Sequence, residues 1–100
     1  MRVAAVQLNS TEHLDRNLSA AENLVRAAAA DGAQLVVLPE KWTTLGPPEA
    51  LREAAQPLSG PAMVAAASWA QDLGIHLLAG SFPESGEDGK RWMEGDAAVP

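Results

Sequence analysis

Glu40 is the residue whose position in the sequence most clearly suggests chemistry. It ends the stretch GAQLVVLPE, residues 32–40, in which an apolar run and a proline come directly before the carboxylate. Proline has no amide hydrogen for a strand ladder, so the predicted strand ends at Leu38. In parallel sheets, functional groups gather beyond the carboxyl ends of the strands. Glu40 is therefore predicted to lie where an acid could act on a ligand.

Three interpretations of Glu40 are open from this pattern. It could be a solvated loop acid, since most surface glutamates have no chemical role. It could bind a ribose hydroxyl in a dinucleotide-binding fold, although the turn QLNSTEHLD after the first predicted strand has no glycine to cradle a phosphate. It could be a general base whose pKa is raised by burial to about 6 to 7, a value that suits proton transfer at neutral pH.

Few other side chains could complete a catalytic site with Glu40. The sequence has no cysteine, which removes disulfides, thiolate metal sites and a cysteine nucleophile. Lys41 directly follows Glu40, so in an extended backbone its side chain would point away from the glutamate, and we interpret it as a solvated loop lysine. Lys90 lies in an acidic, glycine-rich stretch and is interpreted as a turn residue.

Serine and histidine chemistry receives no support from the spacing. Ser81 is not a candidate nucleophile, because no histidine is placed by the sequence to activate it. His13 falls near a helix start and is expected to be solvated, whereas His76 lies in an apolar strand and is interpreted as a core or sheet-face residue. Two isolated histidines without an acidic cluster predict no metal site, and we expect no cofactor.

The strands that must position Glu40 are predicted from apolar runs with little alternation, which are typical of strands covered on both faces. Such runs occupy residues 2–8, 34–38 and 75–80. With helices between them, the strand-helix-strand-helix-strand order predicts an α/β fold with a mainly parallel sheet.

Three helices are predicted between and after these strands. Apolar residues at spacings of three and four indicate a helix that starts between Thr11 and Asp15, either of which could cap it, and that stops at Gly32. Prolines and glycines mark a short helix at about residues 48–55 and a longer one at residues 61–73.

Composition and charge limit the classes of partner. The chain of 100 residues suffices for one small domain, and 47% of its residues are hydrophobic. A formal net charge of −6 with scattered basic residues argues against nucleic acid. No apolar segment approaches the roughly 18 residues of a membrane span, and the start is too short in its apolar part for a signal peptide. We expect no membrane partner and a cytoplasmic location.

Four stretches, in their order and spacing, carry a resemblance to a known family. They are AAVQLNS, then Asp15 with Asn17-Leu18 opening a helix, then GAQLVVLPE, and finally LGIHLLAGSFPE. Over roughly residues 2–89 they resemble the N-terminal portion of the nitrilase superfamily, the carbon–nitrogen hydrolases. The resemblance implies a partial α-β-β-α sandwich, and it favours the general-base interpretation of Glu40.

The resemblance also implies a mechanism. The family's active site holds a cysteine nucleophile, a lysine and glutamate, and Glu40 matches the first glutamate, in the family's LPE motif. That glutamate accepts the thiol proton, the thiolate attacks an amide or nitrile carbon, and water later hydrolyses the thioester. An adjacent base and a cation suit this chemistry, because a thiol is mostly protonated at neutral pH and an oxyanion develops. No residue here matches the cysteine or the lysine, so the chain alone is predicted to be inactive.

Two aromatic residues lie close to the predicted site. Trp42, like Trp69, is interpreted mainly as a packing residue, but its place two residues beyond Glu40 could also put it on the rim of a pocket. Phe82 follows the third predicted strand and could line the same rim.

The resemblance ends near Gly89. Residues 1–89 are predicted to form the N-terminal part of a carbon–nitrogen hydrolase domain. Residues 90–100, KRWMEGDAAVP, depart from the family pattern and are predicted to be a divergent, disordered tail, which suggests a truncated or frame-shifted chain. Half of a sandwich would leave a sheet face and a strand edge uncovered, which predicts self-association.

Three functional hypotheses follow. In the first, the complete enzyme hydrolyses a small amide or nitrile (linear amides, ω-amides, carbamoyl groups and nitriles all fit) and forms a homo-oligomer. In the second, the chain is a non-catalytic interaction module that pairs its exposed sheet with a full-length relative. The third, a nucleotide-binding α/β domain, is weakened by the glycine-free first turn.

Overall fold

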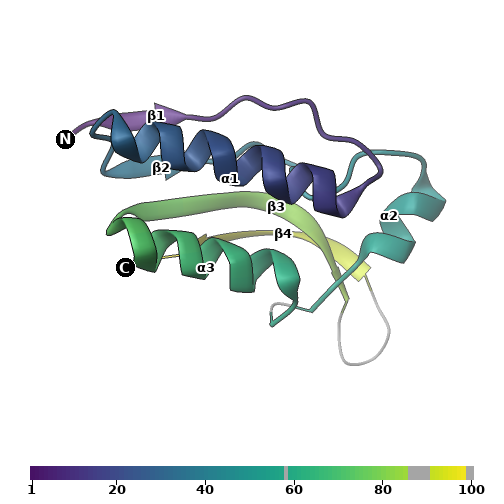
Figure 1. The fold of residues 1–100 in the computed structure, drawn as a ribbon. Helices are drawn as coiled ribbons and strands as arrows, with labels where there is room; N and C mark the ends of the chain where they lie inside the picture. Colours follow the sequence, from purple (N-terminus) through teal and green to yellow (C-terminus); the bar gives the residue numbers. More distant parts are fainter. Residues whose placement is uncertain (58, 86–90, 99–100) are drawn as a thin grey trace.

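The strands form one four-stranded sheet in the order β1-β2-β3-β4. The computed structural model describes residues 1–57, 59–85 and 91–98. Its strands are β1 (Val3–Ala5), β2 (Leu35–Val37), β3 (His76–Ser85) and β4 (Arg91–Ala98). The first three run parallel, and β4 pairs antiparallel with β3 (Figure 1). The predicted α/β fold with a mainly parallel sheet is confirmed.

Helices connect the parallel strands. Helix α1 (Leu14–Ala30) joins β1 to β2, and helices α2 (Pro48–Ala54) and α3 (Pro61–Leu73) lie between β2 and β3. Helix α3 ends at Gly74, whose left-handed φ of 65° stops the helix as the sequence predicts. Within the described residues, no helix is both long and apolar enough to cross a membrane.

Helix α1 begins at Leu14, within the predicted range from Thr11 to Asp15, but its cap differs from the prediction. His13 occupies the N-cap position and no side chain caps the helix, so the expectation of a cap by Thr11 or Asp15 is wrong. The backbone N–H and the hydroxyl of Thr11 are instead directed at the side chain of Asn17. The hydroxyl of Thr11 also accepts a hydrogen bond from the N–H of His13 at 3.1 Å, before the first turn of the helix.

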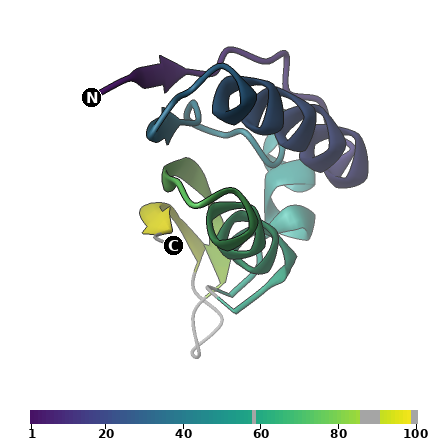
Figure 2. The ribbon, with the colours of Figure 1, turned by 60° about the vertical axis from the view of Figure 1, so that its left-hand side comes forward.

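Helices α1 and α3 cover the same face of the sheet (Figures 1 and 2). From the strands, Val36, Leu77 and Ala79 point into this face and are 1% exposed or less. The helices contribute mainly small side chains to the same cluster: Ala21 and Val25 from α1, and Ala62, Ala66, Trp69 and Ala70 from α3. The core is therefore thin, and its volume depends strongly on the few large side chains in it.

The two covering helices also meet at the surface. Arg26 on α1 makes both contacts. Its Nε lies 2.8 Å from Oε2 of Glu22 on the same helix, and Nη2 of Arg26 lies 3.7 Å from Oδ2 of Asp72 on α3. The hydrogen bond with Glu22 raises the pKa of Arg26. Exposed ion pairs contribute little to stability, so the packing of these helices rests on their buried side chains.

The opposite face of the sheet is open. Because side chains alternate along a strand, the register places Val3, Leu35 and His76 in one row and Ala5, Val37 and Leu78 in the next. These six residues form the outer sheet face. Val3 is 55% exposed and Leu78 is 45% exposed. The exposed His76 agrees with its interpretation as a sheet-face residue.

Strand β4 lies where the sequence predicted a disordered tail. Residues 91–98 pair with β3 from Ser85↔Arg91 to Leu77↔Ala98, so that prediction is wrong for these residues. The sequence around Gly95 has weak strand propensity, and pairing along the edge of β3 overrides it. Lys90, interpreted as a turn residue, lies outside the described residues.

A β-bulge interrupts β3 between Leu78 and Ser81. The buried alternation of Leu77 and Ala79 continues at Phe82 and not at Ser81. Gly80, at the bulge, has a φ of 59°. A Cβ at Gly80 would collide with the carbonyl oxygen of Pro39 and lie 2.8 Å from that of Leu38. Glycine is therefore required both by the backbone conformation and by the close approach of two chain segments.

Replacing Gly80 by alanine is expected to lower the free energy of unfolding by about 3 kcal/mol or more, because a backbone collision adds to the cost of the left-handed φ. Gly74→Ala is the matched control: its φ is 65° and no atom lies within 4 Å of an added Cβ. The control is expected to cost about 1 to 2 kcal/mol. Urea unfolding followed by tryptophan fluorescence measures both, and equal losses would contradict the close contact at Gly80.

Candidate functional site

Glu40 lies in the turn that directly follows β2, at the carboxyl edge of the sheet. The backbone just before Glu40 is bonded on both edges: Val6, directly after β1, donates its N–H to the carbonyl oxygen of Val37 at 2.8 Å, and Leu38 donates its N–H to that of Leu78 in β3 at 2.9 Å. The side chain of Glu40 is exposed. The burial expected of a general base is thus not provided by the described residues.

The backbone turns sharply directly after Glu40. Lys41 has a φ of 52°, the one positive value at a non-glycine residue in the described part of the chain, and such a conformation costs about 1 to 2 kcal/mol. Its N–H donates to Oγ of Ser81 at 3.1 Å, a bond that contributes about 1 kcal/mol. The Lys41 side chain is exposed, as predicted, but its backbone is not extended as that prediction assumed.

This turn directs Trp42 into the core. Trp42 and Phe82 are both fully buried, which corrects the expectation that they line a pocket rim. The ring of Trp42 packs against that of Trp69 with centroids 6.1 Å apart. The interpretation of Trp42 and Trp69 as packing residues is therefore confirmed. Burial of such a side chain stabilises by about 2 to 3 kcal/mol, more than the left-handed turn costs. Trp42 therefore anchors Glu40 to the core.

Asn17 fastens the other end of this segment. Its side chain is 2% exposed, and its Oδ1 accepts from the N–H and the hydroxyl of Thr11 at 2.9 and 3.0 Å. Its Nδ2 donates to the carbonyl oxygens of Thr11 and Thr43 at 2.7 and 2.6 Å. Leu45 adds a backbone bond from its N–H to Thr11. The side chain of Asn17 thus joins the loop after β1 to the loop after β2 and uses its full bonding capacity.

The segment between these fastenings is buried although it is polar. Trp42 Nε1, Thr43 Oγ1 and Thr44 Oγ1 are shielded from solvent and find no hydrogen-bond partner among the described residues. An unpaired buried polar group costs about 1 to 3 kcal/mol. The segment is therefore held in place against a local penalty, which makes its fastening by Asn17 and Trp42 more important.

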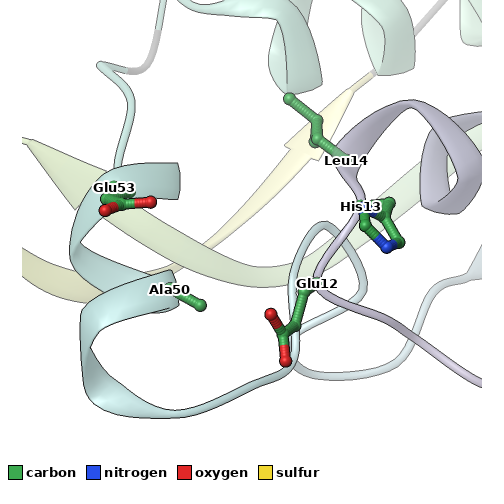
Figure 3. A pocket seen from close by; sticks show the side chains of 5 residues that line it. All are labelled: Glu12, His13, Leu14, Ala50 and Glu53. Atoms are coloured by element: carbon green, nitrogen blue, oxygen red, sulfur yellow. The ribbon is translucent and has the colours of Figure 1, made fainter.

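An open hollow of about 330 Å³ lies elsewhere, between the start of α1 and α2 (Figure 3). Its lining residues are Glu12, His13, Leu14, Ala50 and Glu53. Glu40 is not among them, so the hollow is not part of the candidate site. Within the described residues, no group of three or more histidine, cysteine, aspartate or glutamate side chains could hold a metal ion.

The structure brings Ser81 to the backbone beside Glu40 and leaves the other candidates apart. His13 is exposed at the start of α1, as expected. The sequence reasoning did not identify the roles of Asn17 and Ser81. A signal for Asn17 exists, since it lies four residues before Ala21 on the buried stripe of α1, where a polar side chain must find partners. The contact of Ser81 depends on the bulge, which the sequence pattern does not reveal.

Known proteins resemble this chain over nearly all of it. The model of the carbon-nitrogen hydrolase family matches residues 2–96. The chain is 38% identical over 88 residues to an omega-amidase from Danio rerio, spanning 88% of this chain and 31% of that protein. It is 36% identical over 87 residues to a deaminated glutathione amidase from Bos taurus, spanning 86% of this chain and 26% of the relative.

A solved structure shares the fold. Nit3 from Saccharomyces cerevisiae, a member of branch 10 of the nitrilase superfamily, matches 97% of this chain and 39% of its own with a TM-score of 0.86 and 23% identity. What this structure shares with the present chain is the α/β fold. The chain belongs to the carbon–nitrogen hydrolase family. The matched region extends past Gly89 into β4.

Replacing Asn17 by alanine is expected to lower the free energy of unfolding by about 2 to 3 kcal/mol, because the buried carbonyl oxygen of Thr43 loses its side-chain donor and the half-buried Thr11 loses its bonds to the amide. Asn23→Ala is the matched control, an exposed asparagine on the same helix, with an expected change of about 0.5 kcal/mol or less. Urea denaturation of both variants makes the comparison. A loss at Asn17 no larger than at Asn23 would show that the two loops are not held by this amide.

Proposed function

We propose that this chain supplies the general base, Glu40, of a carbon–nitrogen hydrolase of the amidase or nitrilase type. The observation that carries the proposal is the placement of Glu40 at the carboxyl edge of the sheet, on a turn fastened by the Lys41 amide and the buried Trp42. A general base must be held within hydrogen-bond reach of the proton that it removes. Membership of the carbon–nitrogen hydrolase family supports this role.

The proposed reaction divides the work between groups inside and outside these residues. The Glu40 carboxylate accepts the proton of a cysteine thiol, and the thiolate sulfur attacks the carbonyl carbon of an amide. Glu40 passes this proton to the leaving nitrogen as the C–N bond breaks, so ammonia or an amine departs and a thioester remains. Water then hydrolyses the thioester to a carboxylic acid and restores the thiol. A lysine stabilises the oxyanion that forms in each step.

The names of two relatives support an amide as substrate, since one is an omega-amidase and another a deaminated glutathione amidase. The chain spans less than a third of the length of either relative. The cysteine has to come from outside these 100 residues, because the sequence has no cysteine. The lysine is proposed to come from outside as well, because neither Lys41 nor Lys90 matches the family's catalytic lysine. The chain alone is therefore proposed to be inactive. A homo-oligomeric complete enzyme and a cytoplasmic location stay predictions.

A hybrid enzyme tests the role of Glu40. In it, this chain replaces the segment that it matches in the Danio rerio omega-amidase, so that the relative supplies the missing groups. Glu40→Gln is expected to lower kcat about 10³-fold, because an amide side chain cannot accept the thiol proton. Glu53→Gln, an exposed glutamate of α2, is the control and is expected to keep kcat within about twofold. Hydrolysis of a small ω-amide is followed by ammonia release.

The result with Glu40→Gln decides the proposal. Full activity of this variant in a folded hybrid would refute the general-base role. Ammonia release by the 100-residue chain alone, insensitive to Glu40→Gln, would refute both the role and the proposed inactivity. Circular dichroism of each variant verifies that a loss of activity is not a loss of fold.

A second candidate function is favoured by the outer sheet face. Its apolar side chains include Val3 and Leu78, 55% and 45% exposed, and exposed apolar patches mark association surfaces. In this candidate the chain is a non-catalytic module that pairs the outer sheet face with a full-length relative or with a second copy of itself.

Light scattering after size-exclusion chromatography tests this candidate. The chain is expected to self-associate, and Leu78→Lys is expected to weaken association about tenfold, because a charge would enter an apolar interface. Leu24→Lys, at a side chain 40% exposed on α1, is the matched control and is expected to leave association unchanged. A stable monomer with no affinity for a full-length relative would eliminate the candidate.

A further inference from the structure

We propose that Ser81 is a positioning residue for Glu40, which it orients through the backbone amide of Lys41. The inference rests on the proposed function of Glu40 and goes beyond it, because it assigns the orientation of the carboxylate to a side chain on a different strand. Ser81 lies 41 positions after Glu40 in the sequence.

Lys41 occupies a conformation that its residue type disfavours. With a φ of 52° it is the one non-glycine residue with positive φ in the described ranges, and it is the direct neighbour of Glu40. Such a conformation persists only where the surroundings determine it. The one side-chain hydrogen bond found for the Lys41 amide within those ranges is the 3.1 Å bond to Oγ of Ser81. Since the Lys41 amide is part of the peptide group that joins Glu40 to Lys41, this bond restrains that peptide plane and so bears on where the carboxylate lies.

The bulge in β3 is what makes the Ser81 hydroxyl available. In a regular strand Ser81 would share the helix-covered face with Leu77 and Ala79. The extra residue of the bulge shifts the alternation, so Phe82 is buried and Ser81 is only half-buried. Bulges re-aim side chains in this way next to functional sites. Ser81 thereby reaches the edge where β2 ends.

The contact at Gly80 fixes the distance between the two partners. The backbone of Gly80 passes so close to Leu38 and Pro39 that no Cβ fits between them. The two chain segments therefore touch at Gly80 and Pro39. Ser81 is the next residue after this contact in one segment, and Glu40 and Lys41 are the next residues in the other. A hydroxyl placed one residue from that point has little freedom to move away from the Lys41 amide. The close contact at Gly80 thus explains why Ser81 accepts the hydrogen bond of the Lys41 amide.

The first measurement uses the 100-residue chain itself. Amide hydrogen exchange of Lys41, followed by NMR, is compared in the parent, Ser81→Ala, Ser81→Thr and Ser68→Ala, where Ser68 is an exposed serine of α3. Ser81→Ala is expected to speed the exchange of the Lys41 amide about tenfold and to move its backbone chemical shifts out of the left-handed range. Ser81→Thr, which keeps the hydroxyl, and Ser68→Ala are expected to match the parent. Equal exchange in Ser81→Ala and the parent would overturn the proposal.

The second measurement uses the hybrid enzyme and separates positioning from stability. Ser81→Ala is expected to lower kcat about tenfold or more with KM within about twofold, since a small misplacement of a catalytic group slows the chemical step. Ser81→Thr is expected to restore kcat, and Ser68→Ala to leave it unchanged. If Ser81→Ala affected stability alone, it would reduce the amount of folded enzyme, and kcat per reactive active-site thiol would stay at the parent value. That result would overturn the inference.

Glu40→Gln, measured in parallel, distinguishes the two ways to fail. If Glu40→Gln abolishes turnover while Ser81→Ala keeps kcat within twofold, the general-base role stands and the positioning role falls. If Glu40→Gln itself remains active, the proposed function fails, and the role of Ser81 falls with it. Should the hybrid not fold, the exchange of the Lys41 amide in the chain still decides whether the Ser81 bond exists.

Discussion

The backbone of Gly80 lies against the carbonyl oxygens of Leu38 and Pro39, closer than any side chain would allow. Gly80 also lies at the bulge of β3, and without that bulge a regular strand would keep Ser81 on the side of the helices. Once the alternation has shifted, Phe82 fills the core and the hydroxyl of Ser81 meets the amide of Lys41. The burial of Phe82 in the core and the bond of Ser81 at the edge that carries Glu40 thus both depend on the bulge in β3.

The turn that carries Glu40 is fastened from two sides by unlike interactions. Ser81 and Trp42 act directly after the glutamate, and Asn17 acts on Thr43, where the segment continues toward α2. The left-handed residue costs about 1 to 2 kcal/mol, and the burial of Trp42 with one hydrogen bond outweighs it. The remaining unpaired hydroxyls of Thr43 and Thr44 add cost. A turn with so many local penalties keeps its conformation only because tertiary contacts impose it.

The elements that could be predicted from the sequence, the parallel strands and the ends of α3, depend on local signals. The apolar runs located the parallel strands, and Pro61 and Gly74 located the ends of α3, because proline and glycine act through their own backbone geometry. What it predicted poorly depends on distant partners. The burial of Trp42 follows from the φ of Lys41 and the packing of Trp69, and β4 follows from pairing with β3. The exposure of Glu40 was likewise not predictable, since it depends on which segments surround the edge of the sheet.

Under the proposed function, position and environment of the catalytic carboxylate are built separately. The described residues supply the position, through the backbone of Lys41 and the anchor at Trp42. They do not supply an enclosure, since the Glu40 side chain is exposed. A general base needs both, because a thiol proton is transferred over a hydrogen-bond distance and in a site shielded from bulk water. The relatives are more than three times as long as the part of them that this chain matches. Under the proposal, segments outside these 100 residues would have to cover the edge that carries Glu40.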